Sequence, residues 1–377
     1  MRGKMIPYHI PYMPKQEVVL DAATLAAAKQ YDAATLFDGI PLYRNMASRM
    51  LLTHSAAAAL EMMAMMADIQ PGDEIILPAF TYVATANAFA RQGAVLRFAD
   101  IEMETLNIDP LSVEALMTER TRAIIPIHYG GIAADLERLQ KLQSEHCLLL
   151  EDAAHTLGAT YSGQALGSFG DMSCISFHES KNITSAGNGG ALIVKAAQNM
   201  REAEEILYQG TDREAFMRGE ILRYHWQRLG SAFEMGLAAK AFLKAAIGDM
   251  EVVTEHRREL WWRYHHALMP LLKREHLKLA VCPDIAETNG HIFYICLNTV
   301  ETREALITYL FSKGIEARTH YEPLHLSRFG IGVSGKKLVL PNTEMVGRTL
   351  LRLPIYAEMT DCLQDEVIDA LFEFFKR

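Results

Sequence analysis

Cysteine is scarce in this chain of 377 residues, which has only five. They are widely spread, odd in number and without a C-x-x-C pair: Cys147, Cys174, Cys282, Cys296 and Cys362. Such a set fits neither a disulfide framework nor a zinc site. We therefore expect buried thiols in a reducing compartment, a cytoplasmic protein and no metal centre.

Long apolar runs and a surplus of basic residues are also missing. The most apolar window, residues 56–69, is interrupted by Glu61 and Asp68 and is too short to span a bilayer. Residues 1–14 contain three prolines and no long apolar stretch, so we expect no signal peptide. The net charge of −9 argues against a nucleic-acid binder or an anionic-membrane binder. A small anionic ligand, which needs only a local site, stays open.

Short apolar runs alternate with helix-like segments between residues 55 and 194. The runs are continuous rather than alternating, which indicates strands covered on both faces, as in a parallel sheet wrapped by helices. This pattern predicts a doubly wound α/β fold. We expect strands at 50–53, 74–77, 95–99, 123–127, 147–150 and 172–175, and helices at 56–67, 85–92, 110–118 and 136–145.

The pattern of predicted helices and strands changes after about residue 240. One long helix candidate, residues 252–272, is followed by a mixture of shorter elements. We therefore predict a large α/β domain at 1–240 and a smaller α+β domain at 241–377. In the second domain we expect strands at 292–297 and 316–320 and helices at 303–313, 344–350 and 363–375.

Lys181 is the first candidate for chemistry. It lies between the apolar run 172–175 and the glycines Gly187, Gly189 and Gly190, on a predicted tight connection between two strands. An amine fixed in a desolvated cleft has a lowered pKa and can react with an aldehyde. The alternative is a surface lysine on a loop, and only partners elsewhere in the chain favour the chemical interpretation.

Asp152 and His155 supply such partners, because they follow the buried run 147–150 directly. Ligands of open α/β sheets bind beyond the carboxyl ends of the strands, where both side chains would project. A lone acid there would equally fit a helix cap. With Lys181, however, the set suits pyridoxal phosphate (PLP), which needs an amine for its aldehyde and a carboxylate that keeps its ring nitrogen protonated. We expect His155 near the ring oxygen.

The phosphate of such a cofactor needs hydrogen-bond donors. A helix that begins after Ser55 would offer the N–H groups of Ala56 and Ala57 and a partial positive charge, although Ser55 also fits a simple N-cap. Ser176 would add a hydroxyl. Tyr82 follows another strand and would stack on a flat ring; its alternative is ordinary core packing.

Four segments together resemble the DegT/DnrJ/EryC1/StrS family of sugar aminotransferases. They are residues 78–87, 127–131 (Ile-His-Tyr-Gly-Gly), 152–155 and 176–182 (Ser-Phe-His-Glu-Ser-Lys-Asn). The resemblance covers nearly the whole chain and implies the fold type I architecture of PLP-dependent aminotransferases. Within the family it is nearest to the transaminases that convert dTDP-4-oxo-6-deoxy-D-glucose to dTDP-4-amino-4,6-dideoxygalactose.

The resemblance implies a role for each cofactor residue. Lys181 would form the Schiff base and shuttle protons, Asp152 would pair with the ring nitrogen, and Tyr82 would stack on the ring. His155 would lie at the ring hydroxyl and Ser176 would bind the phosphate. L-Glutamate would donate the amino group to a nucleotide-linked keto-sugar, for surface polysaccharide or antigen biosynthesis. The family also implies a homodimer with shared active sites.

Residues 317–325 match a motif of the family's small domain. Arg318, His320, Tyr321 and His325 would face the sugar nucleotide. The alternative for each is a strand and turn that pack on the large domain.

Several positions depart from the family pattern. Ala57 stands where relatives carry a threonine or serine for the phosphate, and Asn188 replaces a glutamate. Ala232 replaces a residue that would reach the partner's phosphate site, and the region 39–55 is short. Two alternatives therefore stay open: a 3-aminotransferase or perosamine-type enzyme acting on another nucleotide sugar, and a non-catalytic relative that only binds sugar nucleotides.

Overall fold

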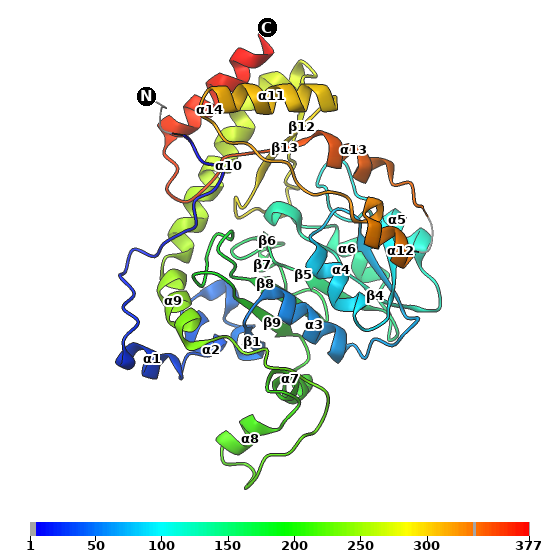
Figure 1. Cartoon of the computed structure of the whole chain (residues 1–377), viewed down its shortest axis with the longest axis vertical. Coiled ribbons are helices and arrows are strands. Elements are labelled where there is room, and N and C mark those ends of the chain that lie inside the picture. Colours follow the sequence, from blue (N-terminus) through cyan, green and yellow to red (C-terminus); the bar gives the residue numbers. More distant parts are fainter. Residues whose placement is uncertain (1–4, 335–336, 377) are drawn as a thin grey trace.

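A computed structural model describes residues 5–334 and 337–376 of the chain. Its centre is a seven-stranded sheet in the order β1-β9-β8-β5-β4-β2-β3 (Figure 1). The pairs from β3 to β8 are parallel, and β9 lies antiparallel between β8 and β1. This mostly parallel sheet confirms the predicted α/β class. The strands are β1 (Met50–Thr53), β2 (Glu74–Pro78), β3 (Val95–Ala99), β4 (Thr121–Ile124), β5 (Leu148–Asp152), β8 (Met172–Ser176) and β9 (Gly190–Val194).

Both faces of the sheet are buried, as its continuous apolar strands indicate. Within β2, Ile75 and Leu77 pack into one apolar cluster while Ile76, between them, packs into another. Successive side chains of a strand point to opposite faces, so each face has its own layer of helices. The helices of this part are α1 (Ala22–Ala28), α2 (Ala33–Phe37), α3 (Ala56–Met66), α4 (Val83–Ala90), α5 (Pro110–Leu116), α6 (Leu136–Lys141) and α9 (Leu237–Gly248).

An arm extends away from the sheet between β9 and α9. It contains α7 (Met200–Leu207) and α8 (Arg213–Met217), and its far end projects at the bottom of Figure 1. Several large apolar side chains on this arm are exposed.

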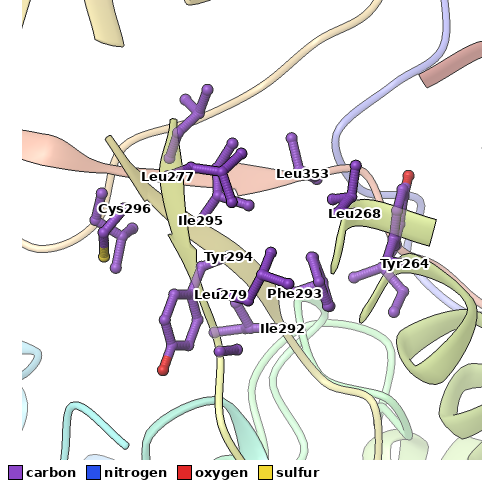
Figure 2. Packing of buried hydrophobic residues seen from close by; sticks show 14 of the residues in the cluster. Tyr264, Leu268, Leu277, Leu279, Ile292, Phe293, Tyr294, Ile295, Cys296 and Leu353 are labelled. Carbon is purple, nitrogen blue, oxygen red and sulfur yellow. The ribbon is translucent and has the colours of Figure 1, made fainter. Parts of the chain in front are cut away.

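The long helix α10 (Met250–Lys273) leads to a second sheet of three antiparallel strands, in the order β10-β12-β13. Apolar residues of α10 and of these strands form one core, part of which is shown in Figure 2. The division into domains at residue 240 stays a prediction. The strands and helices here are β10 (Leu277–Leu279), β12 (Phe293–Leu297), β13 (Leu350–Leu353), α11 (Val300–Ser312), α12 (Arg328–Ser334), α13 (Pro341–Thr349) and α14 (Asp361–Phe375).

A small third sheet joins β11 (Ala286–Glu287), β6 (Thr160–Tyr161) and β7 (Gln164–Ala165). In the part of the chain that the structure describes, no helix is both long enough and apolar enough to cross a membrane.

The predicted strand at residues 316–320 is wrong. This segment makes only isolated bridges, one from Ile315 to Ile6 and one from Arg318 to Arg352 of β13. A continuous ladder is therefore missing, although the segment does run beside the edge of the second sheet.

The direction of the strands determines where a ligand can bind. Because β1 and β8 are each antiparallel to β9, β1 runs in the same direction as the parallel strands. The carboxyl ends of β1, β2, β4, β5 and β8 therefore meet at one edge of the large sheet, which is where open α/β sheets bind ligands.

Candidate active site

A cavity of about 630 Å³ opens at this edge, and residues of the second sheet and its neighbouring loops complete its wall. It brings together ten of the residues that the sequence singled out. These are Ser55, Ala56, Ala57, Tyr82, Asp152, His155, Ser176, Lys181, His320 and Tyr321.

Lys181 lies on the loop between β8 and β9, as predicted. Its backbone N–H donates to the carbonyl oxygen of His178 at 2.9 Å, and the Glu179 N–H donates to that of Gly187 at 2.8 Å, so the loop is tightly turned. Burial lowers the pKa of the Lys181 amine to about 8, against the opposing charges of Asp152 and Cys174. A minority of the amine population is therefore neutral near pH 7, far more than for an ordinary lysine, and can act as a nucleophile.

Asp152 ends β5 and is only 5% exposed. Its Oδ2 accepts a hydrogen bond of 2.6 Å from the Thr85 hydroxyl, and its Oδ1 accepts one of 3.1 Å from the Ala154 N–H. The Cys174 thiol lies 3.5 Å from the same Oδ1. These donors hold a carboxylate in a fixed orientation beside the cavity, which suits pairing with a protonated ring nitrogen.

His155 is buried, and its Nδ1 accepts a hydrogen bond of 3.2 Å from the Gly130 N–H. A neutral ring with this bond carries its proton on Nε2 and can donate it. Burial, followed by the charges of Lys181 and His320, holds the pKa of His155 well below its usual value. The ring lies against that of His291, with 4.7 Å between the centroids. His155 is therefore a neutral donor at the wall of the cavity.

The N-terminus of α3 forms another part of the wall. Ser55 caps the helix, because its Oγ accepts a hydrogen bond of 3.1 Å from the Ala58 N–H. The N–H groups of Ala56 and Ala57, in the first turn, have no acceptor within their own helix. Gly190 allows the helix to come this close, since a Cβ there would lie 2.4 Å from the Ala56 nitrogen. Ser176 also lines this cavity, from the end of β8.

Two aromatic groups form the outer wall. The Tyr82 ring is 61% exposed and lies 6.4 Å, centroid to centroid, from the ring of Tyr321. His320 Nδ1 lies 3.0 Å from the Tyr129 hydroxyl, and burial lowers the pKa of His320 to about 3. A stacking surface and a neutral imidazole therefore face the same space.

The other two predicted substrate residues lie outside this cavity. Arg318 pairs with Glu316 on an exposed surface. His325 is buried, with its Nε2 3.4 Å from a Glu344 carboxylate oxygen. Arg318 precedes His320 and bridges Arg352 of β13 through its backbone, and His325 follows in the 3-10 helix Leu324–Leu326.

The cavity also contains residues that the sequence did not single out, among them Tyr8, His9, Thr85, His291 and Arg352. Arg352 had a detectable signal, since it is the one charged residue in the apolar run Leu350-Leu351-Arg352-Leu353-Pro354. Thr85 and His291 reach the site through tertiary packing alone.

These residues fit PLP. The reactive amine, the fixed carboxylate and the neutral imidazole donor line one cavity with the helix N-terminus that Gly190 leaves open. Ala57 has no hydroxyl to offer the phosphate, but its backbone N–H remains. When bound, the cofactor supplies an aldehyde that takes up an amino group and a protonated ring that withdraws electrons.

Comparison with known proteins identifies the same chemistry. The model of the DegT/DnrJ/EryC1/StrS aminotransferase family matches residues 45–372. The chain is 32% identical to a "pleiotropic regulatory protein" of Geobacillus stearothermophilus, over 82% of this chain and 80% of that protein. It is 28% identical to the spore coat polysaccharide biosynthesis protein SpsC of Bacillus subtilis, over 100% and 98% of the two chains.

Solved structures share the fold. Spr1654 of Streptococcus pneumoniae, described as a sugar aminotransferase, has been solved in its PMP, apo and PLP forms. Its PMP form superposes with a TM-score of 0.85 at 23% identity, over 97% of this chain and 99% of that one. The chain described here belongs to the DegT/DnrJ/EryC1/StrS family and is a PLP-dependent sugar aminotransferase.

Proposed function

We propose that this chain is a cytoplasmic homodimer that transfers an amino group from L-glutamate to a nucleotide-linked keto-sugar. The proposed substrate is dTDP-4-oxo-6-deoxy-D-glucose, the product dTDP-4-amino-4,6-dideoxy-D-galactose, and the destination a surface polysaccharide or antigen. One observation carries the proposal: the Lys181 amine, with its pKa lowered to about 8, lines the same cavity as the Asp152 carboxylate. The polysaccharide role named for the Bacillus relative is consistent with it.

Each side chain has a task in this reaction. Lys181 would hold the cofactor through its amine and, once the donor amine has taken its place, would carry a proton from the donor carbon. Asp152, oriented by Thr85, keeps the ring nitrogen charged. Ser176 and the first turn of α3 hold the phosphate, Tyr82 covers the ring, and His155 donates to the ring oxygen. His320 and Tyr321 face the sugar.

A non-catalytic relative is the second candidate, because the Geobacillus relative is named as a regulatory protein. Binding alone, however, requires neither a neutral lysine amine nor a carboxylate held by three donors. Such features are typical of chemistry at a perturbed site. The geometry therefore favours the enzyme.

The proposed dimer is supported by the arm that contains α8. Met217, Leu222, Trp226 and Leu229 are each at least 66% exposed, although they are large and apolar. Exposed apolar groups gathered on one segment are typical of a protein interface. We propose that a second copy of the chain covers them.

Product analysis tests the proposed reaction. The purified protein is incubated with PLP, ¹⁵N-labelled L-glutamate and, in separate samples, dTDP-, UDP- and GDP-linked keto-sugars. We expect ¹⁵N at C4 of the dTDP-sugar, detected by NMR and mass spectrometry, and no product from Lys181→Ala.

Three other results would change the assignment. Label at C3 would identify a 3-aminotransferase, and label only in a GDP-sugar would identify a perosamine-type enzyme. Binding of a nucleotide sugar without label in any product would favour the non-catalytic relative.

A further inference from the structure

His291 is a buried histidine in the wall of the cavity, and the reaction described above gives it no task. It lies on the loop before β12 and is 6% exposed. Its backbone N–H donates to Oδ1 of Asn289 at 3.1 Å, and its carbonyl oxygen accepts a hydrogen bond of 2.9 Å from Nη2 of Arg257. Both backbone groups are therefore held in place, and the ring with them.

Asn182, the residue after Lys181, determines which nitrogen of the His291 ring carries the proton. The amide nitrogen of Asn182 donates to the carbonyl oxygen of Asn289 at 3.0 Å, so the amide oxygen is the atom that faces His291. This oxygen can only accept a hydrogen bond, and it lies 2.9 Å from Nδ1 of the ring. The proton of His291 is therefore on Nδ1.

The second ring nitrogen of His291, Nε2, is then an acceptor. Burial, followed by the charges of His155 and Lys181, holds the pKa of His291 well below its usual value, so the ring is neutral. A neutral imidazole with its proton on Nδ1 carries a lone pair on Nε2. None of the described residues forms a hydrogen bond with Nε2, and His291 lines the cavity. This lone pair is therefore left for a ligand.

His155 has the opposite tautomer, although its ring lies beside that of His291 with 4.7 Å between the centroids. Its Nδ1 accepts from the Gly130 N–H, so its Nε2 donates. The two neighbouring imidazoles thus offer one donor and one acceptor to the same cavity. A donor suits the ring oxygen of the cofactor, whereas an acceptor requires a ligand with an O–H or N–H group of its own.

The two proposed substrates differ in what they offer to an acceptor. The carboxylates of L-glutamate can only accept, and its amine is the group that the cofactor takes up. A keto-sugar carries hydroxyl groups, which can donate. The ring oxygen of PLP is attached next to its aldehyde, so a group beside His155 is close to the reacting carbon. The matching donor is therefore a hydroxyl near the keto group.

We propose that His291 accepts a hydrogen bond from the sugar hydroxyl adjacent to the keto group and so selects sugars that carry it. This inference rests on the proposed function, for whose substrate the group is the C3 hydroxyl. An acceptor left without a partner in a desolvated site is unfavourable, so a sugar that lacks this hydroxyl is rejected. The residue next to Lys181 thereby sets the specificity, because Asn182 fixes the tautomer.

The test compares two sugars that differ only at this hydroxyl, dTDP-4-oxo-6-deoxy-D-glucose and its 3-deoxy counterpart. Protein loaded with pyridoxamine phosphate is mixed with each sugar, and the appearance of the visible cofactor band gives kcat/KM. His291→Asn keeps a donor for Asn182 but has no atom in the place of Nε2. His325→Asn, at a buried histidine outside the cavity, is the matched control. Calorimetry with dTDP-6-deoxy-D-glucose and its 3-deoxy counterpart, which cannot react, measures binding separately.

We expect the wild type to prefer the sugar with the hydroxyl by roughly 5-fold to 100-fold, and His291→Asn to lose most of this preference. His325→Asn should keep it. The half-reaction of the PLP form with L-glutamate should be alike in the wild type and His291→Asn, whereas a merely structural histidine would affect both half-reactions. Asn182→Ala frees the tautomer, should lower the preference in the same way, and serves as the test if His291→Asn fails to fold.

Three outcomes would overturn the inference. They are a wild type that treats the two sugars alike, a His291→Asn variant that keeps the preference, and an equal loss in both half-reactions, which would assign His291 to the cofactor or to Lys181. Failure of the proposed function looks different: the wild type would aminate no sugar, while the binding of the two unreactive sugars would still report on His291.

Discussion

The environment of individual residues sets the chemistry of this site. Lys181 and Asp152 are ordinary residue types, and burial lowers the pKa of the Lys181 amine so that it can act as a nucleophile in the cavity that the Asp152 carboxylate also lines. Hydrogen bonds from Thr85 and Ala154 to the carboxylate complete this arrangement.

The first residue-scale prediction concerns pH. Only the neutral amine attacks an aldehyde, so capture of PLP by the apoprotein should accelerate as pH rises through about 8 and then level off. Stopped-flow absorbance measures this rate. The Asp152 charge raises the pKa of Lys181, and Asp152→Asn should therefore shift the inflexion to lower pH. An inflexion near the ordinary lysine pKa of about 10.4 would show that the amine is solvated.

The second residue-scale prediction concerns Thr85, which is fully buried. Thr85→Val keeps the shape but removes the 2.6 Å hydrogen bond to Asp152. Loss of a bond to a charged group costs about 1.5–3 kcal/mol, so PLP should bind roughly 10-fold to 150-fold more weakly in equilibrium titrations. Thr81→Val is the control, because among the described residues the Thr81 hydroxyl forms a hydrogen bond of 3.3 Å with Thr85 and none with Asp152. Equal affinities for the two variants would contradict the assigned role.

At the scale of elements, the apolar runs predicted the bounds of six of the seven strands of the large sheet within a few residues. The expected strand at 95–99 matches β3, and that at 147–150 overlaps β5. The order of the strands and the antiparallel direction of β9 were not predictable, because they depend on pairing between distant segments. The error at residues 316–320 has the same cause: extended backbone was predicted, but the partner strand was not.

The residues of the candidate site likewise fall into those that could be predicted from the sequence and those that could not. Lys181, Asp152 and Ser176 were predictable because each lies at or just beyond the end of an apolar strand. Thr85 and His291 were not, because their roles depend on which segments meet across the cavity. Arg318 and His325 were predicted as neighbours of His320, but Arg318 lies exposed beside β13 and His325 is buried in the 3-10 helix Leu324–Leu326.

Gly190 provides the element-scale prediction, since it sets the distance between β9 and α3. In Gly190→Ala the new Cβ would lie 2.4 Å from the Ala56 nitrogen, so strand and helix must separate. We expect a loss of about 1–3 kcal/mol in the free energy of unfolding, together with weaker PLP binding. Gly248→Ala, in α9, is the control because nothing lies within 4 Å of its added Cβ. Denaturant titrations measure the free energy of unfolding of both variants. If Gly190→Ala were as stable as Gly248→Ala, Gly190 would not set the distance between β9 and α3.

At the scale of the whole molecule, the exposed arm predicts assembly. If a second copy covers it, placing charge there should separate the subunits. We expect a dimer for the wild type and a monomer for the double variant Leu222→Asp and Trp226→Asp in analytical ultracentrifugation. Phe311→Asp, at another exposed apolar position, on α11, should leave the dimer intact. A wild-type monomer would contradict the proposed dimer.

One cavity is formed by the edge of the large sheet, the second sheet and the loops between them. The central claim is that Lys181 binds the cofactor covalently in this cavity. Reduction of the PLP-loaded protein with borohydride, followed by peptide mass spectrometry, locates the attachment. We predict a phosphopyridoxyl group on Lys181 and loss of this label in Lys181→Ala. A label on another lysine, or none on the folded wild type, would contradict the claim.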